Sequence, residues 1–554
     1  MTGGPKTMDL DENALLVLNK RYLVKDEAGN PVETPDGLFR RVAGSIAAVE
    51  GGYASGRREE MNEAFYRMMA GLEFLPNSPT LMNAGRPLGQ LAACFVLPIE
   101  DSLDSIFDQV KLTAHLHQTG GGTGFSFSRL RPKNDVVRST TGVASGPVSF
   151  IRVFNCATGV MKQGGTRRGA NMGVLRIDHP DIEEFITVKR DPAELTNFNL
   201  SVAVTDDFMR AYEAGGAFPL VNPRTKKEVK IIGARELLGL VAESAWASGE
   251  PGMIFIDTIN RANPTPHIGE IEATNPCGEQ PLLPYESCCL GSINLSKLAK
   301  NGAIDWERLK QLTHLGVRFL DNVIEASVYP SETVTAITRA NRKIGLGVMG
   351  FAHLLIRLAI PYDSAEAERL GGEIMAFIEK ESKIASGDLA RERGPFPNFK
   401  GSLWDKRGLA QRNGTTTTIA PTGTLSIIAG TSGGIEPVFD IGYTRLILGG
   451  IEVRLEDPLW REMKDRPDAG EELERLFRRA YQVAPLDHLR IQRAFQAHVD
   501  NAVSKTINLP ETATPGEVLD IYVQAHRMGL KGTTIFRNKS RAYQILSCGT
   551  HQIC

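Results

Sequence analysis

The sequence predicts an α/β protein whose strands are parallel and largely buried. From about residue 91 onward, short apolar runs alternate with amphipathic stretches of helical length, the pattern of repeated strand–helix units. The chain of 554 residues, 42% hydrophobic and 23% charged, has the composition of a globular protein with a sizeable core. The alternation does not say whether the sheet closes into a barrel.

Residues 1–90 precede this alternation and are expected to form a helical N-terminal region. In residues 57–72 apolar side chains recur at helical spacing. Pro76 and Pro79 follow and restrict the backbone, so we expect the helix to end before them.

Residues 91–541 are expected to form one α/β region, followed by a tail at 542–554 that carries Cys548 and Cys554. Apolar runs predict strands at residues 91–99, 125–128, 172–177, 198–204, 253–256, 290–295, 344–348, 415–419, 504–509 and 533–536. Amphipathic stretches predict helices at residues 102–118, 148–161, 234–247 and 305–327, and one or two more in 363–393.

Composition and charge exclude several classes of protein. The formal net charge of −2 gives no basic field for nucleic acid, and no run of about 18 apolar residues predicts a membrane span. The N-terminus lacks the basic start and cleavage site of a secretory signal. Seven sparse cysteines do not form a disulfide framework, so we expect a cytoplasmic protein with working thiols.

Cys277, between Pro276 and Gly278, is the first candidate for chemistry. If the segment is extended, Asn275, Cys277 and Glu279 point the same way. Amide, thiol and carboxylate could then hydrogen-bond a diol and place a sulfur against one of its carbon atoms. The alternative is an inert cysteine packed beside a turn, and the segment alone does not exclude it.

Cys288 and Cys289 are adjacent, and Cys94 lies on a different predicted strand. Adjacent cysteines serve as metal ligands, as redox thiols or as packing residues. Because no C-x-x-C partner lies nearby, a closed zinc site has weak support, and we assign no metal ligands. A dithiol with Cys94 requires that the fold bring the two strands together.

Two glycine-containing segments have the character of ligand loops. Residues 420–426, Ala-Pro-Thr-Gly-Thr-Leu-Ser, follow a predicted strand and offer backbone N–H groups and hydroxyls to an anion, although a plain turn into a helix has the same pattern. Residues 120–124 are glycine-rich but follow a predicted helix, so they do not indicate a dinucleotide-binding fold.

Together these motifs resemble the class II ribonucleotide reductases, in order and spacing from about residue 75 to residue 541. The motifs are Asn-Ser-Pro-Thr at 77–80, Asp-Ser-Leu at 101–103, Gly-Gly-Thr-Arg-Arg-Gly at 164–169, Asn-Pro-Cys-Gly-Glu at 275–279, Tyr-Glu-Ser-Cys at 285–288 and the loop at 420–426. The resemblance implies a ten-stranded α/β barrel of the ribonucleotide reductase type, a finger loop near Cys277 and a helical N-terminal region.

The resemblance also implies the catalytic roles. Cys277 would carry a thiyl radical that removes the ribose 3′-hydrogen, Glu279 would take the 3′-hydroxyl proton, and Asn275 would hydrogen-bond the sugar. Cys94 and Cys288 would be the dithiol that ends each turnover as a disulfide.

Re-reduction of that disulfide is assigned in the family to a pair of tail cysteines, here Cys548 and Cys554. These would exchange with a thioredoxin-like reductant.

Two nucleotide sites are implied. Residues expected to line the ribonucleotide substrate are Ser78, Ala93, Gly122, Pro421, Thr422, Gly423, Thr424 and Ser426. Residues expected to bind a dNTP or ATP effector, with Mg²⁺ on the bound nucleotides, are Asp101, Ser102, Leu103, Arg131, Arg138 and Arg167. The effector site would lie at a homodimer interface built on helix 102–118.

The source of the radical follows from Ile535 and Phe536, which stand where class I enzymes have a tyrosine pair. Neither can relay a radical, and no glycyl-radical motif is present in the sequence. The resemblance therefore implies adenosylcobalamin as cofactor, with ribonucleoside diphosphates favoured as substrates. Too few residues precede the catalytic region for the family's ATP cone, so we do not expect overall activity control by dATP.

The sequence departs from the family pattern at Cys289, an extra thiol that could compete for Cys94, and at Ala93, where many relatives have a hydroxyl. The alternatives are a non-catalytic nucleotide-binding paralogue, a class I-like large subunit that needs a radical-generating partner, and a metal-binding protein. The last would use Cys288, Cys289, Cys548 and Cys554 as ligands.

Overall fold

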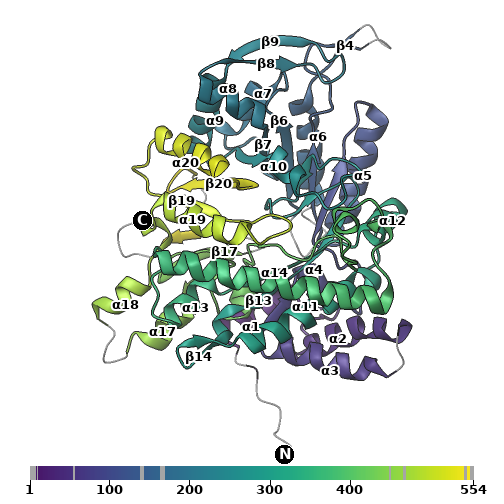
Figure 1. The fold of residues 1–554 in the computed structure, drawn as a ribbon, viewed down its shortest axis with the longest axis vertical. Helices are drawn as coiled ribbons and strands as arrows, with labels where there is room; N and C mark the ends of the chain where they lie inside the picture. Colours follow the sequence, from purple (N-terminus) through teal and green to yellow (C-terminus); the bar gives the residue numbers. More distant parts are fainter. Residues whose placement is uncertain are drawn as a thin grey trace, which may run out of the picture.

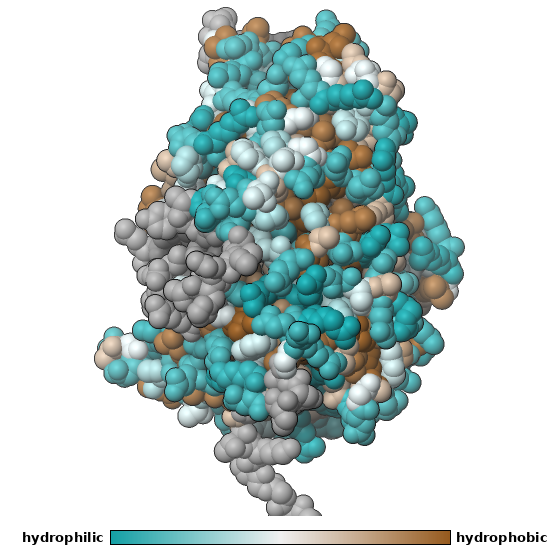
Figure 2. Space-filling model, turned by 90° about the vertical axis from the view of Figure 1, so that its left-hand side faces the viewer, coloured by the Kyte–Doolittle hydropathy of each residue, from teal (hydrophilic) through white to brown (hydrophobic). Residues whose placement is uncertain are grey.

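The computed structural model describes residue 8 and residues 10–53, 56–137, 142–161, 169–447, 451–465, 470–541 and 546–548. A strand barrel occupies the middle of the molecule, with the N-terminal helices α1–α3 at one end and the β8–β9 hairpin at the other (Figure 1). No helix in the described ranges is long and apolar enough to cross a membrane. The face drawn in Figure 2 is mostly hydrophilic, with hydrophobic side chains in small groups between polar ones.

The N-terminal region is helical, as the sequence predicts. Its elements are α1 (Glu12–Arg21), α2 (Pro35–Ala47), α3 (Arg57–Ala70), the short strand β1 (Phe74–Pro76) and α4 (Ser78–Asn83). Asp11 caps α1 by accepting the Ala14 N–H at 2.8 Å, and Thr34 caps α2 just before Pro35. The α2 and α3 helices pack together through apolar faces that are fully buried.

The barrel contains nearly all of the strands that the apolar runs predict. They are β2 (Cys94–Pro98), β3 (Gly122–Ser126), β6 (Asn171–Arg176), β7 (Phe198–Val204), β10 (Gly252–Phe255), β13 (Ser287–Asn294), β16 (Ile344–Met349), β19 (Thr506–Leu509) and β20 (Gly532–Arg537). Strands β2, β3, β6, β7 and β10 run parallel to one another. They meet the rest of the barrel through two antiparallel pairs, β10 with β20 and β2 with β13.

The expected strand at residues 415–419 is wrong as a regular strand, although the segment takes the tenth position of the ring. It joins its neighbours only through isolated parallel bridges, Leu346 to Thr417 and Ile419 to Val503. The reason is Asp500, whose carboxylate accepts the backbone N–H groups of Thr416 and Thr417 that a ladder would otherwise use. With β13, β16, β19 and β20, this segment completes a second group of parallel strands and closes the barrel.

Helices cover the outside of the barrel. The expected ones are α5 (Leu103–Gln118), α6 (Pro147–Met161), α9 (Ala234–Ser248), α11 (Trp306–Ala326) and a single helix α14 (Ala365–Arg393). Others are α7 (Ile182–Thr187), α8 (Asp206–Ala214), α10 (Ile256–Arg261), α12 (Glu332–Asn341), α13 (Phe351–Arg357), α15 (Leu403–Lys406), α16 (Leu425–Ile428), α17 (Pro458–Met463), α18 (Glu471–Leu476), α19 (Pro485–Gln496) and α20 (Pro515–Arg527). Small hairpins are β4 (Val136–Val137) with β5 (Gly142–Val143), β8 (Ala217–Val221) with β9 (Glu228–Gly233), β14 (Ala299–Lys300) with β15 (Ala303–Ile304), and β17 (Gly442–Ile447) with β18 (Ile451–Glu456).

A buried ionic network joins the N-terminal region to the barrel helices. Glu50, just after α2, accepts from Arg318 of α11 at 2.9 Å and from Arg393 of α14 at 2.8 Å. Arg393 also pairs with Asp321 of α11 at 3.0 Å, and the side chains of Glu50, Asp321 and Arg393 are fully buried. Burial alone would raise the pKa of Glu50, but hydrogen bonds from Arg318 and Asn322 and the charge of Arg393 outweigh it and lower the pKa to about 2.

We expect Glu50→Gln to lower the free energy of unfolding by about 3–5 kcal/mol, because it leaves buried arginine charges uncompensated. The lowered pKa means that the contribution of Glu50 is complete above pH 4.5 and is lost as the pH falls toward 2. Calorimetry across this range should therefore show a steeper loss of stability in the wild type than in the variant. Glu63→Gln, which breaks an exposed pair with Arg67, is the control and should change stability by about 0.5 kcal/mol or less. Equal effects of the two substitutions on stability would contradict the stabilising role of the buried network around Glu50.

Candidate functional site

Cys277 lies at the tip of a hairpin inside the barrel, here called the finger hairpin (residues 273–282). Its strands are β11 (Ala273–Thr274) and β12 (Pro281–Leu282). The expected extended segment at the tip is wrong, because residues 275–278 form a turn in which the Gly278 N–H donates to the Asn275 carbonyl at 3.0 Å. Gly278 adopts φ of +82°, a conformation that other residues rarely take, and this reverses the chain directly after Cys277.

The glycine-rich segment at residues 120–124 lies partly in a strand, because β3 begins at Gly122 and not at the expected residue 125. The backbone of the finger hairpin lies directly on it. A Cβ atom added at Gly124 would stand 1.8 Å from the Thr274 carbonyl oxygen, and one at Gly122 would stand 3.1 Å from the Pro276 ring. Gly124 therefore allows the hairpin to enter the barrel to this depth.

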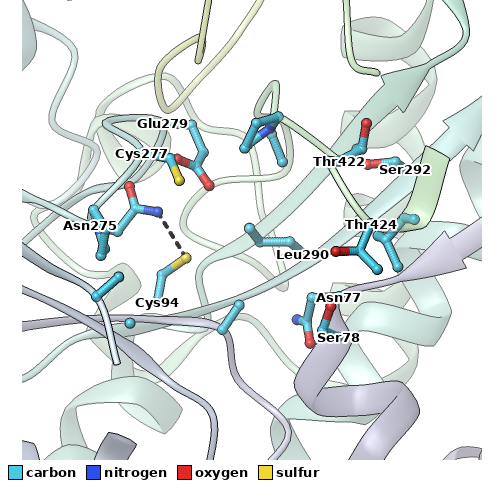
Figure 3. Close-up of a pocket in the computed structure, with 18 of the residues that line it drawn as sticks. Asn77, Ser78, Cys94, Asn275, Cys277, Glu279, Leu290, Ser292, Thr422 and Thr424 are labelled. Carbon is cyan, nitrogen blue, oxygen red and sulfur yellow. Dashed lines mark hydrogen bonds between the residues drawn. The ribbon is translucent and has the colours of Figure 1, made fainter. Parts of the chain in front are cut away.

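A first cavity of about 340 Å³ opens beside the finger hairpin (Figure 3). At one end Asn275, Cys277 and Glu279 meet Cys94, and the Asn275 amide donates to the Cys94 sulfur at 3.1 Å. At the other end lie hydroxyl groups of Ser78, Ser292, Thr422 and Thr424 (Figure 3). One end of the cavity thus carries sulfur, amide and carboxylate groups, and the other end carries hydroxyl groups.

Most of the expected substrate residues line this cavity. They are Ser78, Ala93, Gly122, Pro421, Thr422, Gly423 and Thr424. Ser426 does not reach it: its backbone N–H donates to the Thr422 carbonyl at 2.8 Å as α16 begins, and its side chain lines a third cavity behind the loop. Sequence reasoning missed Arg21, whose helix shows only an ordinary amphipathic pattern, and Ser292, which lies on β13 four residues after Cys288.

Cys94 and Cys288 face each other across β2 and β13. They are direct partners in the antiparallel register, and both belong to the apolar cluster inside the barrel. Cys289 belongs instead to the cluster between the barrel and its helices, because neighbouring residues of a strand point to opposite faces. The expectation that Cys289 could compete for Cys94 is therefore wrong.

The buried cysteines are held as thiols. Burial, reinforced by the neighbouring Cys289, raises the pKa of Cys288 well above its usual value, and burial raises the pKa of Cys289 to about 12. A protonated thiol can donate a hydrogen atom, so the state of Cys288 suits a reductant of a radical more than a nucleophile.

A second cavity, of about 400 Å³, lies on the other side of the finger hairpin. The two cavities share Pro276, Cys277 and Pro421. Strands β7, β10, β19 and β20 supply much of its wall, where apolar side chains such as Ile535 and Phe536 stand beside the charged Glu250, Lys505 and Arg541. Cys277 therefore faces both cavities.

The expected effector residues that the structure describes, Asp101, Ser102, Leu103 and Arg131, lie around the start of α5. Arg131 pairs with Asp101 at 2.8 Å, and Ser102 caps α5 by accepting the Ser105 N–H at 3.2 Å. Leu103 is exposed at the first position of α5. Arg138 and Arg167 lie outside the described residues.

Of the tail cysteines, Cys548 lies in β21 (Leu546–Cys548), which pairs with β17 so that Cys548 stands opposite Tyr443. Cys554 lies outside the described residues. Within the part of the chain that the structure describes, no group of three or more His, Cys, Asp or Glu residues is placed to hold a metal ion.

Comparison with known proteins gives concordant matches along the chain. A family model described as "Ribonucleotide reductase, barrel domain" matches residues 92–536, and "Ribonucleotide reductase, all-alpha domain" matches residues 8–89. The vitamin B12-dependent ribonucleoside-diphosphate reductase of Thermoplasma acidophilum is 46% identical, over 99% of this chain and 82% of that protein. The protein of the same name from Mycobacterium tuberculosis strain CDC 1551 is 51% identical, over 96% of this chain and 80% of its own length.

The geometry predicts that a mild oxidant joins Cys94 to Cys288. Directly opposed residues of an antiparallel pair have Cα atoms about 4.5–5.5 Å apart, inside the range of about 4.4–6.8 Å that a disulfide spans. Peptide mapping by mass spectrometry should find this link equally in the wild type and in Cys289→Ala, and should not find it in Cys94→Ala. A Cys94–Cys289 link as the main product would contradict the strand register.

Proposed function

The chain belongs to the ribonucleotide reductase family, and we propose that it reduces ribonucleoside diphosphates to 2′-deoxyribonucleoside diphosphates with adenosylcobalamin as cofactor. The observation that carries the proposal is the position of Cys277 on the wall shared by the two cavities. One cavity offers hydroxyls and the Cys94 sulfur to a nucleotide, and the other offers both apolar and charged side chains to a cofactor.

In the first cavity the sulfur of Cys277, as a thiyl radical, removes the 3′-hydrogen of the ribose. Glu279 takes the 3′-hydroxyl proton, and the 2′-hydroxyl leaves as water. Cys94 and Cys288 together give two electrons and two protons and become a disulfide, after which Cys277 returns the hydrogen atom to C3′. The balance is one ribonucleotide and one dithiol in, and one deoxyribonucleotide, one disulfide and one water out.

The surroundings of Glu279 support its role as a base of fixed position. Glu279 as a whole is 2% exposed, so water competes little for its side chain. Its backbone carbonyl accepts from the Ala502 N–H at 2.9 Å and from the Thr418 hydroxyl at 3.0 Å. These bonds tie the end of the finger hairpin to the segment 415–419 and to the residues before β19, and so fix the backbone that carries the carboxylate.

The second cavity suits the adenosyl portion of the cofactor. Met253 and Ile254 of β10, Val503, and Ile535 and Phe536 of β20 would hold it by apolar contact. When bound, adenosylcobalamin supplies a carbon radical by homolysis of its cobalt–carbon bond. At this wall the chain itself supplies the thiol of Cys277, on an exposed tip that both cavities reach.

We extend the proposal to regulation and re-reduction. A dNTP or ATP, bound with Mg²⁺, would contact Asp101, Ser102, Leu103, Arg131, Arg138 and Arg167 and set substrate specificity. Two chains would form a homodimer through α5 and α6, since Leu103, Phe107 and Val160 are all more than half exposed on these helices. Within the tail 542–554, Cys548 and Cys554 would pass electrons from a thioredoxin-like protein to the Cys94–Cys288 disulfide.

The decisive test is anaerobic incubation with a ribonucleoside diphosphate, dithiothreitol and adenosylcobalamin, followed by chromatography of the products. We expect deoxyribonucleotide only when the cofactor is present, and none from Cys277→Ser. Cys289→Ala, which changes the cysteine that faces the helices and not Cys94, should retain activity. Product without the cofactor, or none with it, would contradict the proposal. The first outcome would show that the radical has another source, and the second would favour a class I-like subunit that lacks its radical-generating partner or a non-catalytic paralogue.

The dimer has its own test in Phe107→Glu, which places a charge on the exposed face of α5. We expect the variant to sediment as a monomer and to lose the effect of dNTPs on substrate preference, because the effector site would be split. Val229→Glu, on the distant β8–β9 hairpin, is the control and should remain dimeric. A variant at Phe107 that sediments like the wild type would place the interface elsewhere.

A further inference from the structure

The first cavity has one charged side chain of each sign among the described residues that line it. Glu279 lies at the sulfur end, and Arg21 lies at the hydroxyl end, where its guanidinium donates to the Thr424 hydroxyl at 2.8 Å. Figure 3 shows Thr424 and Glu279 on different sides of the cavity. The cavity is therefore polarised, with negative charge beside the chemistry and positive charge beside the loop 420–426.

Arg21 reaches this position from the N-terminal region. It is the last residue of α1, which packs on α16 directly after the loop. Tyr22 is fully buried, its hydroxyl hydrogen-bonds the Ser78 hydroxyl at 2.8 Å, and its carbonyl accepts from Arg86 at 2.8 Å. The contacts of Tyr22 fix the end of α1 against the cavity, so Arg21 is held at the loop by its backbone as well as by Thr424.

The loop itself supplies little positive potential. The helix that follows it, α16, has four residues, too few to build the dipole of a longer helix. The hydroxyls of Ser78, Thr422 and Thr424 are neutral, and the Thr422 hydroxyl already accepts the Gly434 N–H at 2.7 Å. A diphosphate group brings several negative charges, and a guanidinium with paired donors is the side chain best suited to meet them.

We propose that Arg21 is a phosphate-binding residue of the substrate site and that it selects ribonucleoside diphosphates over monophosphates. This inference rests on the proposed function for the identity of the nucleotide. It makes the substrate site composite, because the α-helical N-terminal region supplies the cationic end and the barrel supplies the reacting end. Because Arg21 acts on substrate binding, its replacement should raise KM and leave kcat near the wild-type value.

The test measures equilibrium binding of cytidine 5′-diphosphate and cytidine 5′-monophosphate to the full chain without cofactor, with inorganic pyrophosphate as a competitor. Removal of one charge-assisted bond in Arg21→Gln should weaken diphosphate binding by about 10- to 100-fold. In the same variant, monophosphate binding should weaken less, so that the ratio of diphosphate to monophosphate affinity falls. Pyrophosphate should then compete poorly with cytidine diphosphate. Arg21→Lys keeps the charge and should restore part of the preference. Lys20→Gln removes an exposed charge from the same helix and is the matched control.

Three outcomes would overturn the inference. They are unchanged diphosphate binding in Arg21→Gln, an equal loss for both nucleotides that Arg21→Lys does not relieve, and a wild-type chain that binds neither cytidine diphosphate nor pyrophosphate. Because binding requires neither cofactor nor turnover, an Arg21-dependent preference in a chain that fails to reduce nucleotides would leave this inference standing and remove the proposed function. An active enzyme whose KM for the diphosphate does not change in Arg21→Gln would leave the proposed function standing and remove this inference.

Discussion

The close approach of the finger hairpin to strand β3 is the contact on which the site depends. With the Thr274 carbonyl 1.8 Å from where a Cβ of residue 124 would stand, no side chain fits between the two backbones. Any residue larger than glycine there must push the hairpin away from β3. Since the hairpin divides the barrel interior into two cavities, its depth decides whether Cys277 faces both of them.

The second constraint is the alternation of side chains along β13. It turns Cys288 toward Cys94 inside the barrel and Cys289 outward against the helices, so two adjacent and chemically equal thiols have different surroundings. Glu286, two residues before Cys288, forms a buried ion pair with Lys343 at 2.7 Å. This pair anchors β13 where the strand enters the barrel. The strand register thus places Cys288, and not Cys289, opposite Cys94. Intrinsic thiol reactivity does not distinguish the two.

Sequence patterns predicted the barrel strands well because each is a short apolar run with both faces buried. They failed where the hydrogen bonds of a side chain or of a turn replace those of a strand ladder. Asp500 removes the N–H groups of Thr416 and Thr417 from a strand ladder, and the turn at 275–278 replaces the extended segment that its residue types suggested.

The same limit applies to the site residues. Most of the residues that the resemblance implies for the substrate line the first cavity, but Ser426 is carried behind the loop by the first turn of α16. The resemblance omitted Arg21, which reaches the cavity only because α1 docks on the barrel. Docking of one region on another leaves no periodic signal in the sequence.

A crystal structure of the chain with a ribonucleoside diphosphate and adenosylcobalamin bound together would show directly whether Cys277 lies between substrate and cofactor. We expect the nucleotide in the first cavity, with its phosphates at Arg21 and the loop 420–426, and the adenosyl group in the second. The Cys277 sulfur would lie between the ribose and the adenosyl group. Both ligands on the same side of the finger hairpin, or a ribose out of contact with Cys277, would contradict this arrangement.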